Sequence, residues 1–159
     1  MIPSKQFESM DVSTWDGLQS LGERLYDECF DVDTMCYDEQ TCTVDIPFLR
    51  IWHGGPRRVV KNRLIYRVEE VDVLRCSLRF LDVVRYTLQD PERIGAYTFE
   101  GFRRDEGQGL VAIHGSPNCI VMLAVGRIWA EYREIGFRGK SRITQGYFWD
   151  ANSSAVYDD

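Results

Sequence analysis

The order of apolar and polar residues is most regular between Val59 and Tyr86, where two runs alternate with a two-residue period. In the first run the apolar positions are Val60, Leu64, Tyr66 and Val68, and the basic positions are Lys61, Arg63 and Arg67. In the second run the apolar positions are Leu74, Cys76, Leu78 and Phe80, and Arg75, Ser77 and Arg79 alternate with them. Successive side chains of a strand point to opposite faces, so each run predicts a strand with one apolar and one arginine-bearing face. A sheet covered on one face only is typical of antiparallel structure.

A helical period precedes these runs. Its apolar stripe consists of Leu18, Leu21, Leu25 and Cys29, at three- and four-residue steps. Ser13 or Thr14 can cap the start of this helix. Gly17 and Gly22 each weaken a helix by about 1 kcal/mol relative to alanine, so we expect the helix to depend on docking its stripe onto the sheet. We expect it to be the one substantial helix.

Further strand patterns span residues 41–52, 96–103, 110–113, 119–125 and 143–149. Pro47 cannot donate a ladder hydrogen bond, so we expect the first of these strands to be an edge strand or to bend there. Residues 119–125 are apolar at every position, which predicts a strand buried on both faces and central under the helix. A helix from Ser116 to Ile135 is the rival interpretation, because Ser116 and Pro117 suit a helix start. The β-branched content and Gly126 favour two strands.

Together these patterns predict one domain, residues 1–159, of the α+β class. We expect predominantly antiparallel β-structure, with about seven or eight strands in a sandwich or curled half-barrel and one N-terminal helix packed on it. The expected order is a flexible arm (1–12), a helix and acidic connector (13–40), the β-sheet (41–149) and a polar tail (150–159). The start of the chain lacks the layout of a secretory signal, and no apolar run approaches the roughly 20 residues of a membrane span. We therefore expect a cytoplasmic protein with no membrane partner.

The net charge of −6 is unevenly distributed. Residues 1–45 carry eleven acidic and two basic residues, whereas residues 46–159 carry fourteen acidic and seventeen basic ones. Eight bases lie between Arg57 and Arg85, which suggests a nucleic-acid face formed by Arg57, Arg58, Arg63, Arg67, Arg75 and Arg79. The overall acidity, and four acidic residues within the same stretch, argue against this hypothesis. We do not expect nucleic acid to be the partner.

Five cysteines at irregular spacing suggest free thiols in a reducing compartment. Cys29, Cys36 and Cys42 could join His53 around zinc, but their spacing matches no common zinc module. The acidic connector lacks the pattern of a calcium loop. We expect no metal and no cofactor.

One short motif occurs twice in the chain. His53-Gly54-Gly55-Pro56 and His114-Gly115-Ser116-Pro117 share the pattern H-G-x-P, and they hold the only two histidines. The structural interpretation is two hairpins with the same turn, since proline and glycine favour turns. The functional interpretation is two imidazoles at one end of a sheet, which share a metal or act as acid and base. The turn interpretation is favoured because no third ligand is evident.

No motif of the chain fixes a reaction. The leading hypothesis is a small non-enzymatic protein-binding module, of the kind of bacterial immunity or antitoxin-type partner proteins, whose charged surfaces complement another protein. The alternative is a small enzyme or metal-binding protein that uses the two H-G-x-P segments, and the third is a nucleic-acid binder. The sequence leaves a homo-oligomer open. The candidate binding residues are His53, His114, Trp52, Arg57, Arg58, Arg63, Arg67, Arg75 and Arg79.

Overall fold

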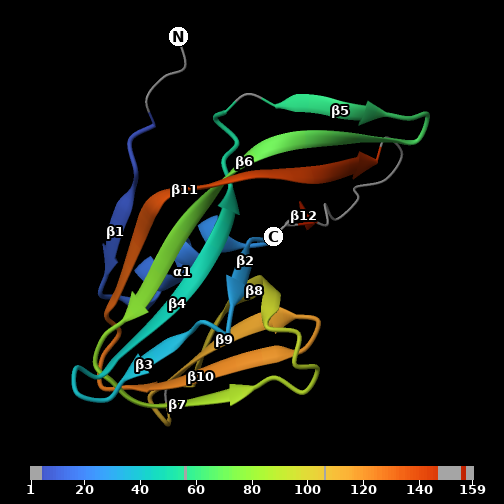
Figure 1. Ribbon diagram of the computed structural model, residues 1–159. Helices are drawn as coiled ribbons and strands as arrows, with labels where there is room; N and C mark the ends of the chain where they lie inside the picture. The colour runs from blue at the N-terminus through green and yellow to red at the C-terminus, as the bar shows by residue number, and fades with distance from the viewer. Residues whose placement is uncertain (1–4, 56, 106, 147–154, 157–159) are drawn as a thin grey trace.

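The computed structural model describes residues 5–55, 57–105, 107–146 and 155–156. Within these ranges one helix and twelve strands follow one another (Figure 1). They are β1 (Ser9–Val12), α1 (Trp15–Leu25), β2 (Cys29–Asp31), β3 (Cys36–Asp38), β4 (Thr43–Ile51), β5 (Arg58–Asn62), β6 (Tyr66–Phe80), β7 (Val83–Gln89), β8 (Ala96–Asp105), β9 (Leu110–Ser116), β10 (Cys119–Val125), β11 (Ala130–Gly146) and β12 (Ala155–Val156). All the strand pairs are antiparallel. The prediction of a mainly antiparallel β-protein with a single helix is therefore confirmed.

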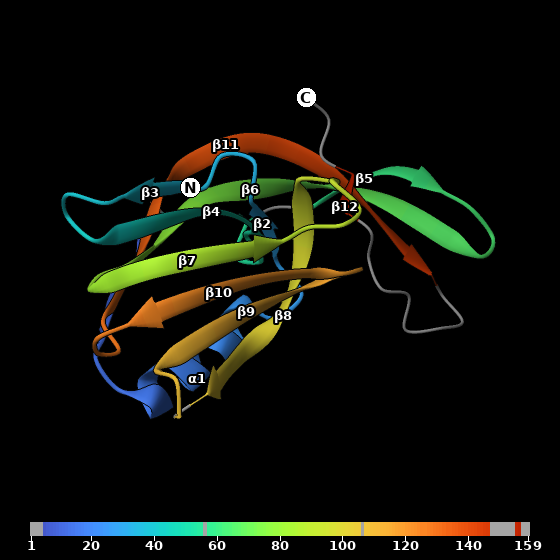
Figure 2. The same ribbon diagram turned by 90° about the horizontal axis from the view of Figure 1, so that it is seen from below.

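The strands form one sheet in the order β1-β11-β6-β4-β2-β8-β9-β10-β7, with β12, β3 and β5 paired beside β11, β4 and β6. Figure 2 shows β11, β6 and β4 as one curved layer and β8, β9, β10 and β7 as a second, and the short β2 links them. The β7 end of this path approaches β3 and the turn before β4: Val83 N donates to Cys42 O at 2.8 Å, and the rings of Tyr37 and Tyr86 lie 5.1 Å apart. The distal parts of β5, β6 and β11 extend away as an arm (Figure 1).

The predicted helix forms, but it is shorter than its apolar stripe. Thr14 is the N-cap, and its Oγ1 accepts a hydrogen bond from Gly17 N at 3.0 Å. The helix ends at Leu25, so Cys29 belongs to β2 and not to the stripe. Gly22 packs against Phe102 of β8, where an added Cβ would lie 3.0 Å from the ring. This glycine therefore allows the close approach of helix and sheet.

Several boundaries differ from the expectation. The strand count exceeds seven or eight because β1, β2, β3 and β12 have only two to four residues, which is too short to show a period. β1 lies within the expected arm, and β2 and β3 lie within the expected acidic connector. The pattern at 143–149 continues β11 as far as Gly146; residues 147–149 lie outside the described residues, as does most of the tail at 150–159.

β10 forms as a strand, and the rival helix does not. It is not central under the helix, however, because it lies between β9 and the end strand β7. Its buried and partly exposed residues alternate, since only one of its faces is turned into the core. The run of apolar residues therefore correctly predicted a strand, but the predicted position of that strand in the sheet was wrong.

Pro47 lies inside the sheet. β4 pairs with β6 along its length, and on its other side with β3 at Thr43–Asp45 and β2 at Phe48–Leu49. Pro47 falls between these two short partners, where no strand is available to receive an N–H group. The prediction of an edge was wrong for the strand as a whole, but the proline does mark a gap in its pairing.

β6 changes its buried face at its midpoint. From Leu74 to Phe80 the even-numbered side chains are buried, as predicted, whereas Glu69, Val71 and Val73 are buried on the odd-numbered face of the arm. β6 itself has no bulge, so its buried face changes because different parts of the structure cover its two halves. All residues of β5 are exposed and Leu64 is 90% exposed, so the predicted apolar face of the first run is not buried.

The core lies between the two layers and α1. It includes aromatic side chains in mutual contact, among them Phe30, Phe48 and Phe99. The described residues contain no helix long and apolar enough to span a membrane.

Candidate functional site

The two H-G-x-P segments have different structures. His53, Gly54 and Gly55 form a loop after β4 that folds over Trp52, while Pro56 lies outside the described residues. His114 and Gly115 instead lie within β9. Gly115 is buried, and an added Cβ would come within 2.7 Å of Phe30 Cζ and 2.9 Å of Tyr97 Cβ. The interpretation of two hairpins with the same turn is therefore wrong, and each glycine is required by a different contact.

The sheet does not bring the two histidines together. β2 and β8 separate β4 from β9, so three strand spacings, about 14 Å along the sheet, lie between their strands. His53 Nδ1 accepts a hydrogen bond from Arg57 at 2.7 Å, and burial, Arg57 and Arg50 lower the pKa of His53. Burial and the charge of Arg103 lower the pKa of His114, and Glu100 opposes this. The two imidazoles have no common neighbour among these groups.

Metal ligands are not assembled in the described part of the chain: no group of three or more His, Cys, Asp or Glu residues is placed to hold an ion. Cys29, Cys36 and Cys42 lie on β2, on β3 and in the turn before β4. Cys76 and Cys119 are buried, as their apolar strand positions predicted. Burial raises the pKa of Cys29 and of Cys119 to about 11, so these thiols are not activated as nucleophiles.

Three of the six candidate arginines have acidic partners. Arg57 and Arg67 both contact the buried carboxylate of Glu69, at 3.1 and 3.0 Å. Arg79 binds Asp45 with two hydrogen bonds, of 3.0 and 3.2 Å. Arg58 and Arg63 are exposed on the arm. These contacts explain much of the basic stretch as local charge pairing.

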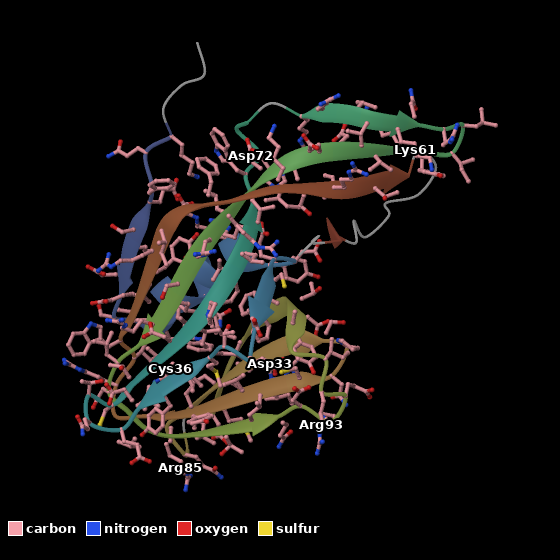
Figure 3. All side chains as sticks on the ribbon, viewed as in Figure 1. Asp33, Cys36, Lys61, Asp72, Arg85 and Arg93 are labelled. Carbon is pink, nitrogen blue, oxygen red and sulfur yellow. The ribbon has the colours of Figure 1, made fainter. Side chains whose placement is uncertain are left out.

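The basic stretch extends over β5, β6 and β7, with Arg58, Arg63 and Arg67 together on the arm. Figure 3 places Lys61 on the arm and Arg85 on β7, at opposite ends of the molecule. Trp52 is partly buried, with its ring 5.1 Å from that of Phe137 and with Lys5 Nζ 5.6 Å from its centre. Trp52 therefore packs within the fold and does not present its ring for stacking on a nucleic-acid base. The candidate arginines are divided between the arm and the second half of β6.

Arg75 has a different environment. It is exposed on the outer face of β6, defined by Arg75, Ser77 and Arg79, which points away from the core. No hydrogen bond or ion pair joins its guanidinium to another residue of the described ranges. The difference from Arg79 follows from the register: Arg79 lies between Asp45 and Glu131 on the neighbouring strands, whereas Arg75 lies between Leu49 and Gly136.

Arg75 borders a cavity of about 270 Å³, which we call the Arg75 pocket. It is lined by Cys29, Phe30, Asp31, Pro47, Phe48, Leu49, Arg75, Ala96 and Arg138. The pocket opens where Pro47 leaves the gap between β2 and β3. Arg138 is the extra residue of a bulge between Phe137 and Gly139 of β11, and bulges commonly redirect a side chain toward a site. Sequence reasoning missed this pocket because its strands pair over long distances; the pair Gly136 and Gly139 around Arg138 was the available signal.

A second depression, of about 390 Å³, lies between α1 and β8. Its lining includes Glu23, Glu100, Tyr26 and Phe102. Both carboxylates are exposed, and its walls contain no basic residue. It is larger than the Arg75 pocket, but its exposed acids indicate a solvated surface between a helix and a bulged strand.

A buried group of charges lies on the core side of the sheet. We call it the Arg50 cluster, and its members are Lys5, Glu28, Arg50, Cys76, Tyr132 and Glu134. Arg50 donates to Tyr132 Oη at 2.8 Å and lies 3.5 Å from Glu134 and 3.8 Å from Glu28. Lys5 Nζ and Glu8 N contact Glu134 Oε2 at 3.1 and 3.0 Å. The cluster thus ties the N-terminal segment and the end of α1 to β4 and β11.

The alternation along β4 and β11 contains a signal for this cluster. Val44, Ile46 and Phe48 point into the core, so Arg50 at the next even position also points inward. Glu134 has the same relation to Ala130 and Tyr132 on β11. Oppositely charged residues at inward positions of two strands predict a buried ion pair. Which strands meet could not be read from the pattern.

The titration of Glu28 is shifted by its surroundings. Burial raises its pKa from 4.5 to about 7, although Arg50 and the hydrogen bond from Ile51 N oppose the shift. Burial and the hydrogen bond to Cys76 raise the pKa of Tyr132, while burial raises that of Cys76. Both shifts keep the thiol and the phenol in their protonated forms, so neither group is activated as a nucleophile.

Glu28 should make stability depend on pH. Its native pKa is above the unfolded value, so the native state binds more protons, and its contribution is lost as pH rises from about 4.5 to about 7. We expect Glu28→Gln, which keeps an acceptor for Ile51 N, to gain about 2 to 3 kcal/mol relative to the wild type between pH 5 and pH 8. Urea denaturation of both proteins at the two pH values measures this change. The exposed Glu92→Gln is the control, and an equal difference for Glu28→Gln at both pH values would contradict the prediction.

Comparisons with protein-family models, with curated proteins and with solved structures find no match to this chain.

Proposed function

We propose that this protein is a small non-enzymatic binding module whose partner is another protein, of the general kind of bacterial immunity or antitoxin-type proteins, and that it acts in the cytoplasm. The observation that carries the proposal is the Arg75 pocket, which has an apolar floor and, at its border, an arginine without an acidic partner among the described residues. Partly apolar pockets bordered by arginine are typical anchor points of protein interfaces.

The size of the pocket supports a protein partner over a metabolite. Sites for small molecules and cofactors have volumes of about 300 to 1,000 Å³, so a cavity of about 270 Å³ accommodates little more than one side chain. The surrounding outer face supplies polar contacts of both signs, since Asp45, Arg79, Glu131 and Arg133 lie on it. An apolar centre within a charged surround matches the usual anatomy of an interface.

Selection of peptides tests the proposal. A random 12-residue library displayed on phage is selected on the purified chain at low salt. We expect clones that bind the wild type and bind Arg75→Glu at least tenfold more weakly, because the substitution reverses the charge at the border of the pocket. Arg58→Glu, at an exposed position of β5, is the matched control and should bind like the wild type. No enriched clone, or clones that bind Arg75→Glu and wild type equally, would argue against the proposal.

A further inference from the structure

We propose that the Arg75 pocket binds a carboxylate carried on a short aliphatic body, supplied by an acidic and aliphatic segment of the partner protein. This inference rests on the proposed function and names the chemistry that the pocket recognises. It requires a cation that is free to pair, a floor that accepts methylene groups, and a pocket acid whose oxygens already accept hydrogen bonds from its own loop.

Arg75 supplies the free cation. Its neighbours across β4 and β11 are Leu49 and Gly136, neither of which can accept a side-chain hydrogen bond. Arg57, Arg67 and Arg79 all have carboxylate partners, so Arg75 differs from them in its unused hydrogen-bond donors. A guanidinium fork binds a carboxylate with two parallel charge-assisted hydrogen bonds.

Two guanidinium groups and one carboxylate line the pocket, those of Arg75, Arg138 and Asp31. At Cys29 burial, Asp31 and Glu28 raise the pKa of the thiol, and Arg138 opposes them with a smaller effect. Asp31 is the acidic residue of the lining, but its two oxygens already accept hydrogen bonds from Asp33 N at 2.8 Å and Thr34 Oγ1 at 3.0 Å. The carboxylate of Asp31 is therefore engaged by its own loop.

The floor of the pocket selects the body of the ligand. Pro47, Leu49 and Ala96 present aliphatic atoms, and Pro47 has no N–H group to offer. A phosphate would require several N–H donors, as at a helix N-terminus or a glycine-rich loop, and the pocket is lined by strand residues and the bulge instead. One carboxylate with a branched aliphatic chain fits both the volume and the chemistry.

Titration with matched fragments tests the recognition. We would follow the backbone amide resonances of ¹⁵N-labelled protein during addition of 4-methylpentanoate or of the neutral 4-methylpentanamide. We expect the carboxylate to shift the resonances of Leu49, Arg75 and Ala96 with a Kd on the order of 1 to 10 mM, as suits a fragment of about eight heavy atoms. The amide should bind at least fivefold more weakly, because it cannot form the charged pair.

Arg75→Gln should weaken binding of the carboxylate about tenfold, whereas Arg58→Gln should leave it unchanged. Arg75 is exposed and unpaired in the described ranges, so both variants should keep the unfolding midpoint of the wild type. Equal binding of acid and amide, equal binding to Arg75→Gln and wild type, no shift up to about 50 mM, or stronger binding of inorganic phosphate would each overturn the inference.

The two proposals fail separately. Peptides that depend on Arg75 but contain no acidic residue, or that keep their affinity when Asp or Glu is changed to Asn or Gln, would overturn the carboxylate while the protein-binding module stands. Binding of 4-methylpentanoate without any selected peptide would overturn the partner protein as the source, and the pocket would then belong to a free carboxylate.

Discussion

Replacing Arg50 by methionine is expected to destabilise the protein by about 3 to 5 kcal/mol at pH 7.5. The substitution leaves Glu28 and Glu134 buried without the guanidinium that lies 3.8 and 3.5 Å from them. It also removes the donor to Tyr132 Oη. Breaking a buried ion pair is costly because the remaining charge stays out of water without its partner. Urea denaturation followed by tryptophan fluorescence measures the loss.

Arg79→Met is the matched control, since Arg79 is an exposed arginine bound to Asp45 and should cost only about 0 to 1 kcal/mol. In the Glu28→Gln/Glu134→Gln background, Arg50→Met should cost much less, because no charged carboxylate is then left alone. An equal cost in both backgrounds would show that Arg50 acts through packing, and a loss below about 1 kcal/mol would contradict the prediction.

Replacing Phe48 by alanine is expected to cost about 3 to 5 kcal/mol as well. Phe48 is 0% exposed, and its ring lies 5.6 Å from that of Phe30 and 5.7 Å from that of Phe99. These rings come from β4, β2 and β8, at the place where the sheet passes from one layer to the other. A cavity there removes contacts from both layers, so the midpoint of denaturation should fall sharply.

The control for this substitution is Leu64→Ala. The alternating pattern places Leu64 on the apolar face of a strand, but it is 90% exposed at the turn between β5 and β6. We expect its loss to change stability by less than about 0.5 kcal/mol. If Leu64→Ala proved as costly as Phe48→Ala, the arm would have to bury this residue in solution.

The local secondary structure of several segments could be predicted from the sequence. A two-residue period identified the second half of β6, and a capping threonine with spaced leucines identified α1, because neighbouring residues alone produce these signals. Burial of Cys76 followed from the same alternation, and burial of Cys119 followed from the run of apolar residues at 119–125. The distinction between strand and helix at β10 followed from β-branched content and one glycine.

The Arg75 pocket could not be predicted from the sequence in this way. Arg75 and Arg79 have the same place in the alternating pattern, four residues apart on one strand. Only the pairing of β6 with β4 and β11 sets Arg79 beside two acids and Arg75 beside leucine and glycine. Cys29, Pro47 and Arg138 join the same pocket from segments far apart in the chain.

The sequence by itself thus determined α1, β4, β6, β8, β9 and β10 and, for β4 and the second half of β6, which side chains share a face. The tertiary structure decided which faces are covered, where β6 exchanges its buried side, and which arginine keeps its charge unpaired. The physical reason is range: the period of a strand arises from bonds between neighbours, whereas burial and charge pairing depend on partners that only the folded sheet brings near.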